Sequence, residues 1–201
     1  MKLYYSPGAC SLSPHIALYE AGLPFQAVMA STRSHKLLDG TDYYTINPKG
    51  YVPLLEFDDG TRLAEGPAIV QWIADQAPEK RLAPPAGTME RYRAQEWLTF
   101  IGTEIHKQFS PLFNPALPRE AKPLFRQKVL DRLAYVDRQL AGRDHLLGHF
   151  TVADGYLYTV TRWAAPLELD ISGLPNLGAF MVRMNSRPAV QQALKAEGLP
   201  A

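Results

Sequence analysis

The stretch from Tyr5 to Leu18, YSPGACSLSPHIAL, constrains the fold more than any other part of the chain, because a strand must give way to a helix within it. The run KLYY at residues 2–5 is short and aromatic and is followed by Pro7-Gly8, which is typical of a strand that ends in a turn. Pro14 is tolerated in the first turn of a helix but not in its interior. The sequence therefore predicts a helix that begins just before Pro14 and continues on apolar residues at helical spacing, Leu12, Ile16, Tyr19 and Leu23.

The only cysteine of the chain, Cys10, falls at this predicted helix start, which spans Cys10 to Ser13. A thiol at a helix N-terminus lies among unpaired N–H groups at the positive end of the helix dipole, and this setting lowers a cysteine pKa from about 8.5 toward neutrality. A lone cysteine can instead be a small buried apolar residue without chemistry. Ser11 and Tyr5 are rival donors or nucleophiles beside it, or simply a helix cap and a strand aromatic.

Composition argues against several classes of function. The 201 residues carry a formal net charge of +1, whereas a nucleic-acid-binding protein needs a basic surface. One cysteine cannot form an internal disulfide, so a reducing compartment is expected. The uncharged N-terminal stretch is too short and too polar to span a bilayer, and too short before Cys10 for a signal peptide, so we expect a soluble, cytoplasmic protein. The sequence shows no zinc-type Cys/His cluster and no phosphate-binding glycine loop, so no metal site is expected.

The first part of the chain predicts a mixed sheet. Residues 25–29 alternate as a second strand would, and residues 53–57 and 61–64 flank an Asp-Asp-Gly turn as a hairpin would. Pro53 opens the third strand, where a proline is tolerated. A cis bond between Val52 and Pro53 has a prior of about 5–6% for an X–Pro pair.

A second helix is predicted to follow this hairpin. Pro67 suits its first position, which puts Gly66 at the cap, where the backbone amide is able to bind an anion. Glu65 beside it could instead merely complement the helix dipole. The residues expected to face inward are Ile69, Trp72 and Ile73.

Residues 78–88, PEKRLAPPAGT, lack periodicity and are rich in proline and glycine, which marks a domain boundary. The segments after it have a helical period, and none reads as a convincing strand. The sequence therefore predicts an α/β domain over residues 1–80 and an all-helical domain over residues 88–201. Helices are expected at residues 88–113, 118–142, 151–163, 174–185 and 188–196.

The long helix predicted over residues 88–113 has an apolar face and a polar one. The apolar face carries Trp97, Ile101, Ile105 and Phe109, and the polar one carries Gln95, Thr99, Thr103, His106 and Ser110. Threonines are indifferent helix formers, so these two are expected to be present for what they contact. The alternative is a solvated face with a stray histidine. Lys107 either polarises a nearby thiolate or points at water.

A helix N-terminus is also predicted at Thr151-Val152-Ala153-Asp154. The spacing is that of a capping box, with Asp in place of the usual Glu. The helix that follows is apolar all round and is therefore expected in the core.

With these residues in this order, the chain resembles a bacterial cytosolic glutathione S-transferase of the beta class over nearly its whole length. The order strand, Cys-bearing helix, strand, Asn-Pro-x-Gly-x-Val-Pro, strand pair and Glu-Gly-Pro helix is similar to the thioredoxin-like glutathione-binding domain of that family. The Thr-Val-Ala-Asp cap resembles that of the core helix in its all-α C-terminal domain. The runs SPGACSL and HKQFSPLFNP are most similar to transferases encoded alongside aromatic-pollutant degradation, some of which dehalogenate.

The resemblance implies a role for each matching residue. Cys10, with His106, would be catalytic and face the glutathione sulfur, and Val52 before a cis Pro53 would pair its backbone with the cysteinyl residue of glutathione. Thr99 and Thr103 would approach the γ-glutamyl end from the partner subunit of a homodimer. The implied glutathione contacts are Cys10, His35, Val52, Glu65, Gly66, Thr99, Thr103, Glu104 and His106, and the implied electrophile-site residues are Tyr5, Lys107 and Trp163.

Three residues depart from the family pattern. Gly66 stands where the family often has serine, so the backbone amide must act without a hydroxyl. His35, with Lys36 beside it, stands where a lysine for the glycyl carboxylate is expected. Gly155 stands where a hydrophobic staple would pair an apolar residue with Phe150, so a weaker cap is expected.

The function implied by the resemblance is conjugation of the glutathione thiolate to small hydrophobic electrophiles. Glutathione would be a co-substrate, with no metal and with neither nucleic acid nor membrane as a partner. Cys10 could add thiol-exchange, peroxidase or dehalogenase activity. The alternative is a non-catalytic relative that binds ligands or a protein partner, which the departures at Gly66 and His35 would favour.

Overall fold

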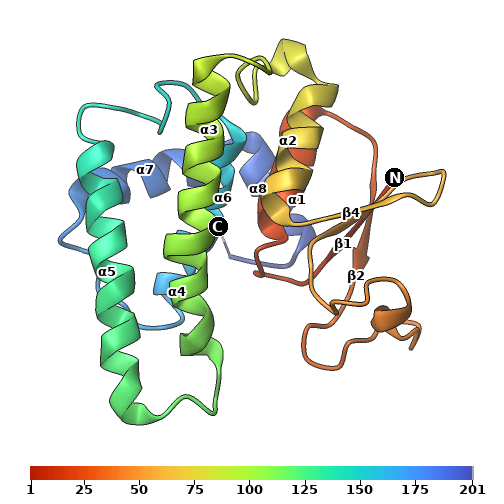
Figure 1. Cartoon of the computed structure of the whole chain (residues 1–201), viewed down its shortest axis with the longest axis horizontal. Coiled ribbons are helices and arrows are strands. Elements are labelled where there is room, and N and C mark those ends of the chain that lie inside the picture. Colours follow the sequence, from red (N-terminus) through yellow and green to blue (C-terminus); the bar gives the residue numbers. More distant parts are fainter. Residues whose placement is uncertain (201) are drawn as a thin grey trace. The chain divides into compact units, whose positions relative to one another are not determined.

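The computed structural model describes residues 1–200 (Figure 1). By their internal contacts these residues form two compact units. Unit 1 comprises Met1–Ala83 and the segment that begins at Arg187, and unit 2 comprises Pro84–Ser186. The last helix was expected in the helical domain, but its contacts group it with the α/β unit.

Unit 1 contains a mixed four-stranded sheet, as expected. Its order is β2-β1-β3-β4, with β1 parallel to β2 and antiparallel to β3, and β3 antiparallel to β4. Leu3 in the central strand lies opposite Ala27 on one side and Leu55 on the other. The strands are β1 (Lys2–Tyr5), β2 (Gln26–Met29), β3 (Leu54–Glu56) and β4 (Arg62–Ala64).

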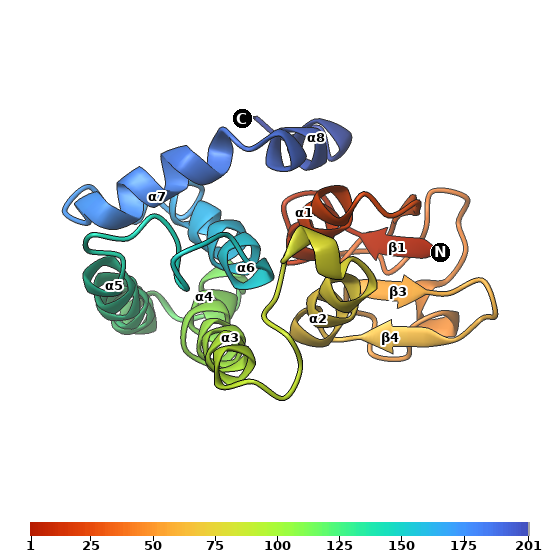
Figure 2. The ribbon, with the colours of Figure 1, turned by 90° about the horizontal axis from the view of Figure 1, so that it is seen from above.

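One face of this sheet is covered by helices α1 (Leu12–Ala21) and α2 (Gly66–Gln76), which pack against each other (Figure 2). Helix α8 (Pro188–Ala196) packs on α1. Since side chains alternate along a strand, Leu3 and Leu55 share this face, and both are fully buried. In α2, Ile69 and Ile73 are buried as expected, whereas Trp72 is only half-buried and lies against the Phe57 ring.

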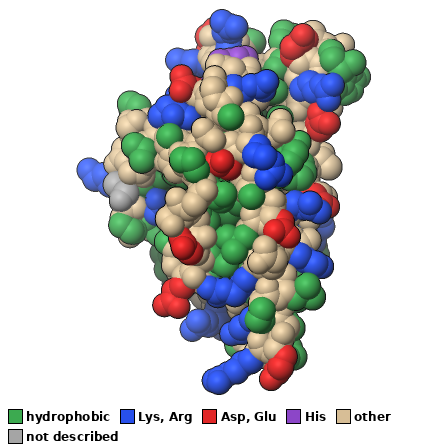
Figure 3. Space-filling model, turned by 90° about the vertical axis from the view of Figure 1, so that its left-hand side faces the viewer, with side chains coloured by type: hydrophobic (Ala, Val, Ile, Leu, Met, Phe, Trp, Pro, Cys, Tyr) green, Lys and Arg blue, Asp and Glu red, His purple; other side chains and the backbone are tan. Residues whose placement is uncertain are grey.

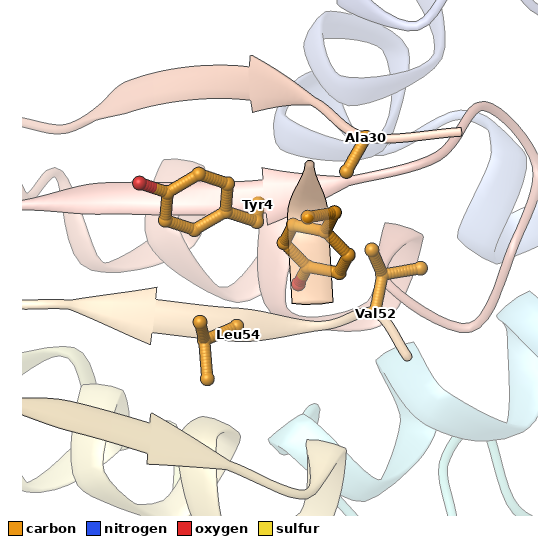
Figure 4. Close-up of a cluster of buried hydrophobic side chains, with 5 residues drawn as sticks. Tyr4, Ala30, Val52 and Leu54 are labelled. Atoms are coloured by element: carbon orange, nitrogen blue, oxygen red, sulfur yellow. The ribbon is translucent and has the colours of Figure 1, made fainter. Parts of the chain in front are cut away.

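The opposite face of the sheet is covered by the segment between β2 and β3. Tyr43, in the short helix η1 (Tyr43–Thr45), packs on Tyr4 of β1 with ring centroids 5.6 Å apart. Figure 4 shows Tyr4 and Leu54 on neighbouring strands, with Ala30 and Val52 completing the cluster. Burial raises the pKa of Tyr43 to about 12. The segment between β2 and β3 is thus anchored by one fully buried tyrosine.

The end of helix α8 is tied to unit 1 by a buried carboxylate. Glu197 accepts a hydrogen bond from the Gly8 amide at 2.9 Å and lies 2.8 Å from Nδ1 of His15. The side chains of His15 and Glu197 are both 0% exposed. The imidazole ring of His15 lies among the rings of Tyr5, Tyr19 and Phe25, with centroids 5.3–5.4 Å away.

Every regular element in unit 2 is helical, as expected. The core helix α6 is buried along its whole length, and the 3-10 turn η6 extends it. The helical segments are α3 (Met89–Phe100), the π-helix η3 (Ile101–His106), α4 (Lys107–Phe109), the 3-10 turns η4 (Ser110–Phe113) and η5 (Arg119–Ala121), α5 (Lys122–Gln139), α6 (Val152–Thr161), η6 (Arg162–Ala164) and α7 (Pro175–Asn185).

The long helix expected over residues 88–113 is interrupted by the π-helix η3. Ile101, Ile105 and Phe109 are fully buried, but Trp97 is only half-buried. Residues four apart drift by about 40° per step around an α-helix. The wider π turn counteracts this drift, and so keeps the three buried residues on one face.

The capping box of α6 is present as predicted. Asp154 accepts from the Thr151 amide at 2.8 Å and from the Leu146 amide at 2.9 Å, and its side chain is fully buried. This one carboxylate therefore fixes both the helix start and the loop before it. The Phe150 ring contacts the His145 ring at 5.9 Å, and the weaker cap expected from Gly155 stays a prediction.

On the face drawn in Figure 3, acidic and basic side chains are interspersed and no continuous basic stripe is visible. This distribution agrees with the small net charge. Among residues 1–200, no helix has both the length and the apolar character needed to cross a membrane.

Candidate functional site

Cys10 lies in the turn before α1, two residues ahead of the first helical residue, as predicted. Its side chain is half-buried, and its thiol donates a hydrogen bond to the Val52 carbonyl at 3.3 Å. This bond exists only while the sulfur carries its proton. The structure therefore joins two of the predicted site residues directly.

The amides at the start of α1 are used differently from what we expected. The Leu12 amide donates to the Ala9 carbonyl at 3.0 Å, and the Ser13 amide donates to the Cys10 carbonyl at 3.2 Å. Pro14, the third residue of the helix, has no N–H. The expectation of unpaired amides around the thiol is wrong at Leu12 and Ser13, because the tight turn supplies acceptors of its own.

The two hydroxyls expected as rivals of Cys10, those of Ser11 and Tyr5, differ in what they can do. Ser11 is fully buried, and its hydroxyl accepts from the Ser6 amide at 3.1 Å and donates to the Ser6 carbonyl at 3.2 Å. Its proton is therefore used within the turn. Burial, helped by the charge of Glu197, raises the pKa of Tyr5, so this phenol is neutral near pH 7 and can still donate.

Two side chains hold the main chain just before Val52 in place. The Tyr51 carbonyl accepts from the Asn47 side-chain amide at 2.6 Å and from the Tyr43 hydroxyl at 3.0 Å. The bond between Val52 and Pro53 is cis, as the resemblance implies. The Val52 carbonyl is thereby fixed opposite the Cys10 thiol.

Glu65 occupies a backbone conformation that non-glycine residues rarely adopt, with φ 69° and ψ 113°. Such a conformation costs about 1–3 kcal/mol and tends to occur at functional sites. Glu65 caps α2 and Gly66 is the first helical residue, one position earlier than we expected. The Glu65 carboxylate binds the Lys49 ammonium at 2.7 Å, and both side chains are exposed.

His35 is half-buried in a left-handed conformation with φ 52°, and its ring lies 4.6 Å from the Tyr44 ring. Its Nδ1 lies 3.1 Å from the Gly50 carbonyl, which can only accept, so Nδ1 carries the proton. A neutral His35 then has a lone pair at Nε2, and only the imidazolium offers a second N–H. The neighbouring Lys36 is exposed.

Unit 2 contains an aromatic cluster, which we define as His106, Phe109, Phe113, Tyr156 and Trp163. The Trp163 ring has edge-on neighbours in Phe109 and Phe113, with centroids at 5.7 and 5.5 Å, and in His106 at 4.9 Å. His106 Nδ1 lies 2.7 Å from the Tyr156 hydroxyl. The cluster thus presents apolar rings with one imidazole among them, which suits a flat hydrophobic ligand with a polar group.

The remaining predicted residues of unit 2 are exposed or have partners outside this cluster. Thr99, Thr103 and Lys107 are exposed, and the Thr103 hydroxyl donates to the Thr99 carbonyl at 3.0 Å. Glu104 forms an ion pair with Arg132 at 2.9 Å. Their expected roles stay predictions.

Sequence reasoning missed Tyr156 and Phe113 as members of the aromatic cluster, and Lys49 as the partner of Glu65. Tyr156 precedes Trp163 by seven residues on a predicted helix, a spacing that puts two residues on one face. That spacing was the available signal. Nothing in the local sequence pointed to Lys49. Among residues 1–200, no group of three or more His, Cys, Asp or Glu side chains is placed to hold a metal ion.

Two family models match the chain. The glutathione S-transferase N-terminal domain matches residues 8–76, and the glutathione S-transferase C-terminal domain matches residues 100–188. Among curated proteins, the chain is 48% identical over 200 residues to glutathione S-transferase GstA of Escherichia coli O157:H7, which covers 99% of this chain and 100% of that protein.

Solved structures agree with these matches. The ternary complex of BphK, a bacterial GST, has a TM-score of 0.97 at 56% identity and covers 99% of this chain and 100% of that one. A sphingomonad glutathione S-transferase complexed with glutathione has a TM-score of 0.95 at 50% identity, and the bacterial beta class enzyme of Sphingomonas chungbukensis has 0.97 at 48%, each covering 100% of both chains. These findings confirm the resemblance drawn from the sequence. The chain therefore belongs to the glutathione S-transferase family.

Proposed function

We propose that unit 1 binds glutathione and that the enzyme joins its sulfur to a small hydrophobic electrophile held at the aromatic cluster of unit 2. The observation that carries this proposal is the Val52 carbonyl, which follows the anchored Tyr51 carbonyl and already accepts a hydrogen bond from the Cys10 thiol. The cysteinyl residue of glutathione has a main-chain amide that can pair with this carbonyl as an added strand would.

Glu65 supports the same proposal through its charge. Its carboxylate binds the ammonium of Lys49 at 2.7 Å, so the geometry there suits an ammonium ion. The γ-glutamyl end of glutathione carries such a group. We assign Glu65 to that group and the backbone amide of Gly66 to the neighbouring carboxylate, because an amide at a helix start favours an anion.

His35 and Lys36 are the two candidates for the glycyl carboxylate. Neutral His35 would meet a carboxylate with a lone pair, which repels it, whereas the imidazolium would donate from Nε2. If His35 is the contact, His35→Gln will raise the KM for glutathione and Lys36→Gln will not. If Lys36 is the contact, the reverse will hold.

The reaction requires a thiolate. The glutathione thiol loses its proton, its sulfur forms a bond to the electrophilic carbon, and the bond to the leaving group breaks with its electron pair. Lowering the pKa of a free thiol to near neutrality takes roughly 2–3 kcal/mol of anion stabilisation, which a few charge-assisted hydrogen bonds supply. Ser11 uses its proton within the turn, so of the two hydroxyls weighed as rivals of Cys10 we propose Tyr5 for this role.

His106 is proposed to act on the electrophile. It is the one ring of the aromatic cluster with both a donor and an acceptor nitrogen, so it can donate a hydrogen bond to the negative charge that develops as the leaving group departs. The apolar rings beside His106 lower the local dielectric and thereby strengthen that bond. The role of His106 toward the glutathione sulfur stays a prediction.

Cys10 supports a second activity, thiol–disulfide exchange. In this reaction the Cys10 thiolate attacks one sulfur of glutathione disulfide, a mixed disulfide forms and one glutathione leaves as its thiolate. The half-buried position of the Cys10 sulfur beside Val52 suits this step. Both reactions would then use the segment of unit 1 that binds glutathione. The nucleophile is the glutathione sulfur in conjugation and the Cys10 sulfur in exchange.

The experiment compares the wild type with Cys10→Ala and Cys10→Ser. We expect retention on immobilised glutathione and glutathione-dependent turnover of an activated aryl halide by all three proteins, and disulfide exchange by the wild type alone. The serine variant is the matched control, because it keeps a donor for the Val52 carbonyl. Absence of both retention and turnover in the wild type would refute the transferase and favour a non-catalytic binding protein.

We also propose that the enzyme is a homodimer. Helix α3 exposes Met89 and Tyr92 at 66% and 57%, and Tyr135 of α5 is 37% exposed next to the Phe100 ring. Exposed apolar groups of this kind often lie in protein interfaces. Light scattering of the wild type and of Tyr92→Glu tests this, and a monomeric wild type would contradict it.

A further inference from the structure

Tyr156 is held against the imidazole of His106 in the aromatic cluster. Its hydroxyl oxygen lies 2.7 Å from His106 Nδ1, and the two rings are nearly perpendicular with centroids 5.9 Å apart. Tyr156 is 4% exposed and sits in helix α6, whose start is fixed by the buried carboxylate of Asp154. The contact is therefore short and rests on a well-anchored helix.

The chemistry of the two groups decides the direction of this hydrogen bond. A neutral imidazole has one N–H and one lone pair, and a phenol hydroxyl both donates and accepts. Because the phenol is the more acidic group, the stronger of the two arrangements is donation from the hydroxyl to the Nδ1 lone pair. The proton of the imidazole is then on Nε2, since the bond at one ring nitrogen determines the state of the other.

We propose that Tyr156 is a positioning residue that holds His106 in the tautomer protonated at Nε2 and fixes the plane of its ring. This inference rests on the proposed role of His106, because the Nε2–H is the group that would donate to the charge developing on the electrophile. A ring free to turn would present a lone pair or a misdirected N–H for part of the time. Tyr156 would thus affect turnover without touching the reacting atoms.

The backbone of His106 adds a second, independent constraint. His106 is the last residue of the π-helix η3, and π-helical turns are frequent at functional sites. A Cβ built on Gly102, in the same π-helix, would lie 3.6 Å from the Tyr156 hydroxyl, so α6 approaches this segment closely. The π-helix η3 and the Tyr156 hydroxyl therefore both constrain His106.

The test uses Tyr156→Phe with Tyr158→Phe as its matched control. Tyr158 is on the same helix, is 1% exposed and uses its hydroxyl on Asn185 at 2.7 Å. Each variant removes one buried hydroxyl from α6. We expect Tyr156→Phe to lower kcat by roughly three- to tenfold, the equivalent of one net hydrogen bond, with the KM for glutathione within about twofold of the wild type. Tyr158→Phe should leave both unchanged.

Nitrogen-15 NMR of the histidines supplies a readout that a structural role would not move. His106→Asn assigns the His106 signals, and we expect the wild-type ring to show its proton on Nε2 and the Tyr156→Phe ring to show a mixture. A wild-type ring protonated at Nδ1 overturns the inference, even if the phenylalanine variant does not fold. Wild-type turnover by Tyr156→Phe overturns it as well.

The His106→Asn variant separates the two levels of the argument. If it lowers kcat while Tyr156→Phe does not, the positioning role alone is wrong. If His106→Asn turns over at the wild-type rate, the proposed role of His106 is wrong and the inference about Tyr156 falls with it.

Discussion

Replacing Glu197 by alanine should destabilise unit 1 far more than the position of this residue near the end of the chain suggests. The Glu197 carboxylate accepts from the Gly8 amide at 2.9 Å and pairs with His15 Nδ1 at 2.8 Å, and both side chains of the pair are fully buried. His15 Nε2 is also buried and has no hydrogen-bond partner. Alanine would remove the carboxylate that accepts from the Gly8 amide and pairs with the imidazole.

The magnitude follows from these two lost bonds. Removing the partner of a buried hydrogen bond costs about 1–3 kcal/mol, and the carboxylate takes part in two such contacts. We therefore expect Glu197→Ala to lower the free energy of unfolding by about 4 kcal/mol. For a chain of this size, about 2–4 °C per kcal/mol makes this a fall of roughly 8–16 °C in Tm. Glu197→Gln keeps an acceptor for Gly8 and should lose about 1–2 kcal/mol.

The assay is urea unfolding followed by circular dichroism, with all proteins at one concentration because association shifts apparent stability. Glu79→Ala is the control, since Glu79 is an exposed carboxylate of the same unit and should change stability by less than about 0.5 kcal/mol. A loss below about 1 kcal/mol in Glu197→Ala, or one no larger than in Glu79→Ala, would refute the reasoning from burial.

Two further predictions concern the segment between β2 and β3. Burial raises the pKa of Tyr43 to about 12, so above its unfolded value of about 10 the folded protein keeps a proton that the unfolded chain releases. Stability from this tyrosine is therefore complete below pH 10 and falls by up to about 2.7 kcal/mol toward pH 12, and urea titrations of Tyr43→Phe should lack that part of the fall. A Cβ on Gly50 (φ 68°) would lie 2.5 Å from Tyr44 and 3.0 Å from His35, so Gly50→Ala should cost about 1–3 kcal/mol and raise the KM for glutathione. Gly60→Ala (φ 84°), with nothing within 4 Å, should show the backbone cost alone, and equal effects of the two changes would contradict the reasoning.

Features set by local chemistry were predicted well from the sequence. The position of Pro14 and the turn at Pro7-Gly8 located the start of α1 to within a residue or two, because a proline is tolerated at few helix positions. The capping box at Thr151 was predicted for the same reason, since both of its hydrogen bonds form within four residues. The alternation at residues 25–29 and the hairpin after Pro53 likewise predicted the mixed sheet.

Features that depend on contacts distant in sequence could not be predicted. From the sequence, the hydroxyl of Ser11 had several possible roles, and the structure shows that it donates to the Ser6 carbonyl. Tyr156 could not be recognised because its partner, His106, lies 50 residues away in the sequence. The π-helix was missed because the four-residue spacing of Ile101, Ile105 and Phe109 was read as an ordinary helix face. The family resemblance implied the roles of Cys10 and Val52. Only the structure could show that the Cys10 thiol donates a hydrogen bond to the Val52 carbonyl.

The return of α8 to the first helix has a consequence for how the protein is made. The α/β unit cannot close until residue 197 has been synthesised, whereas all of the residues of unit 2 have left the peptidyl-transferase centre before then. At roughly 5–20 residues per second, the roughly 100 residues in between delay closure by about 5–20 seconds. During that time the surface of α1 that α8 later covers stays uncovered on the nascent chain, so the half synthesised first is the half completed last.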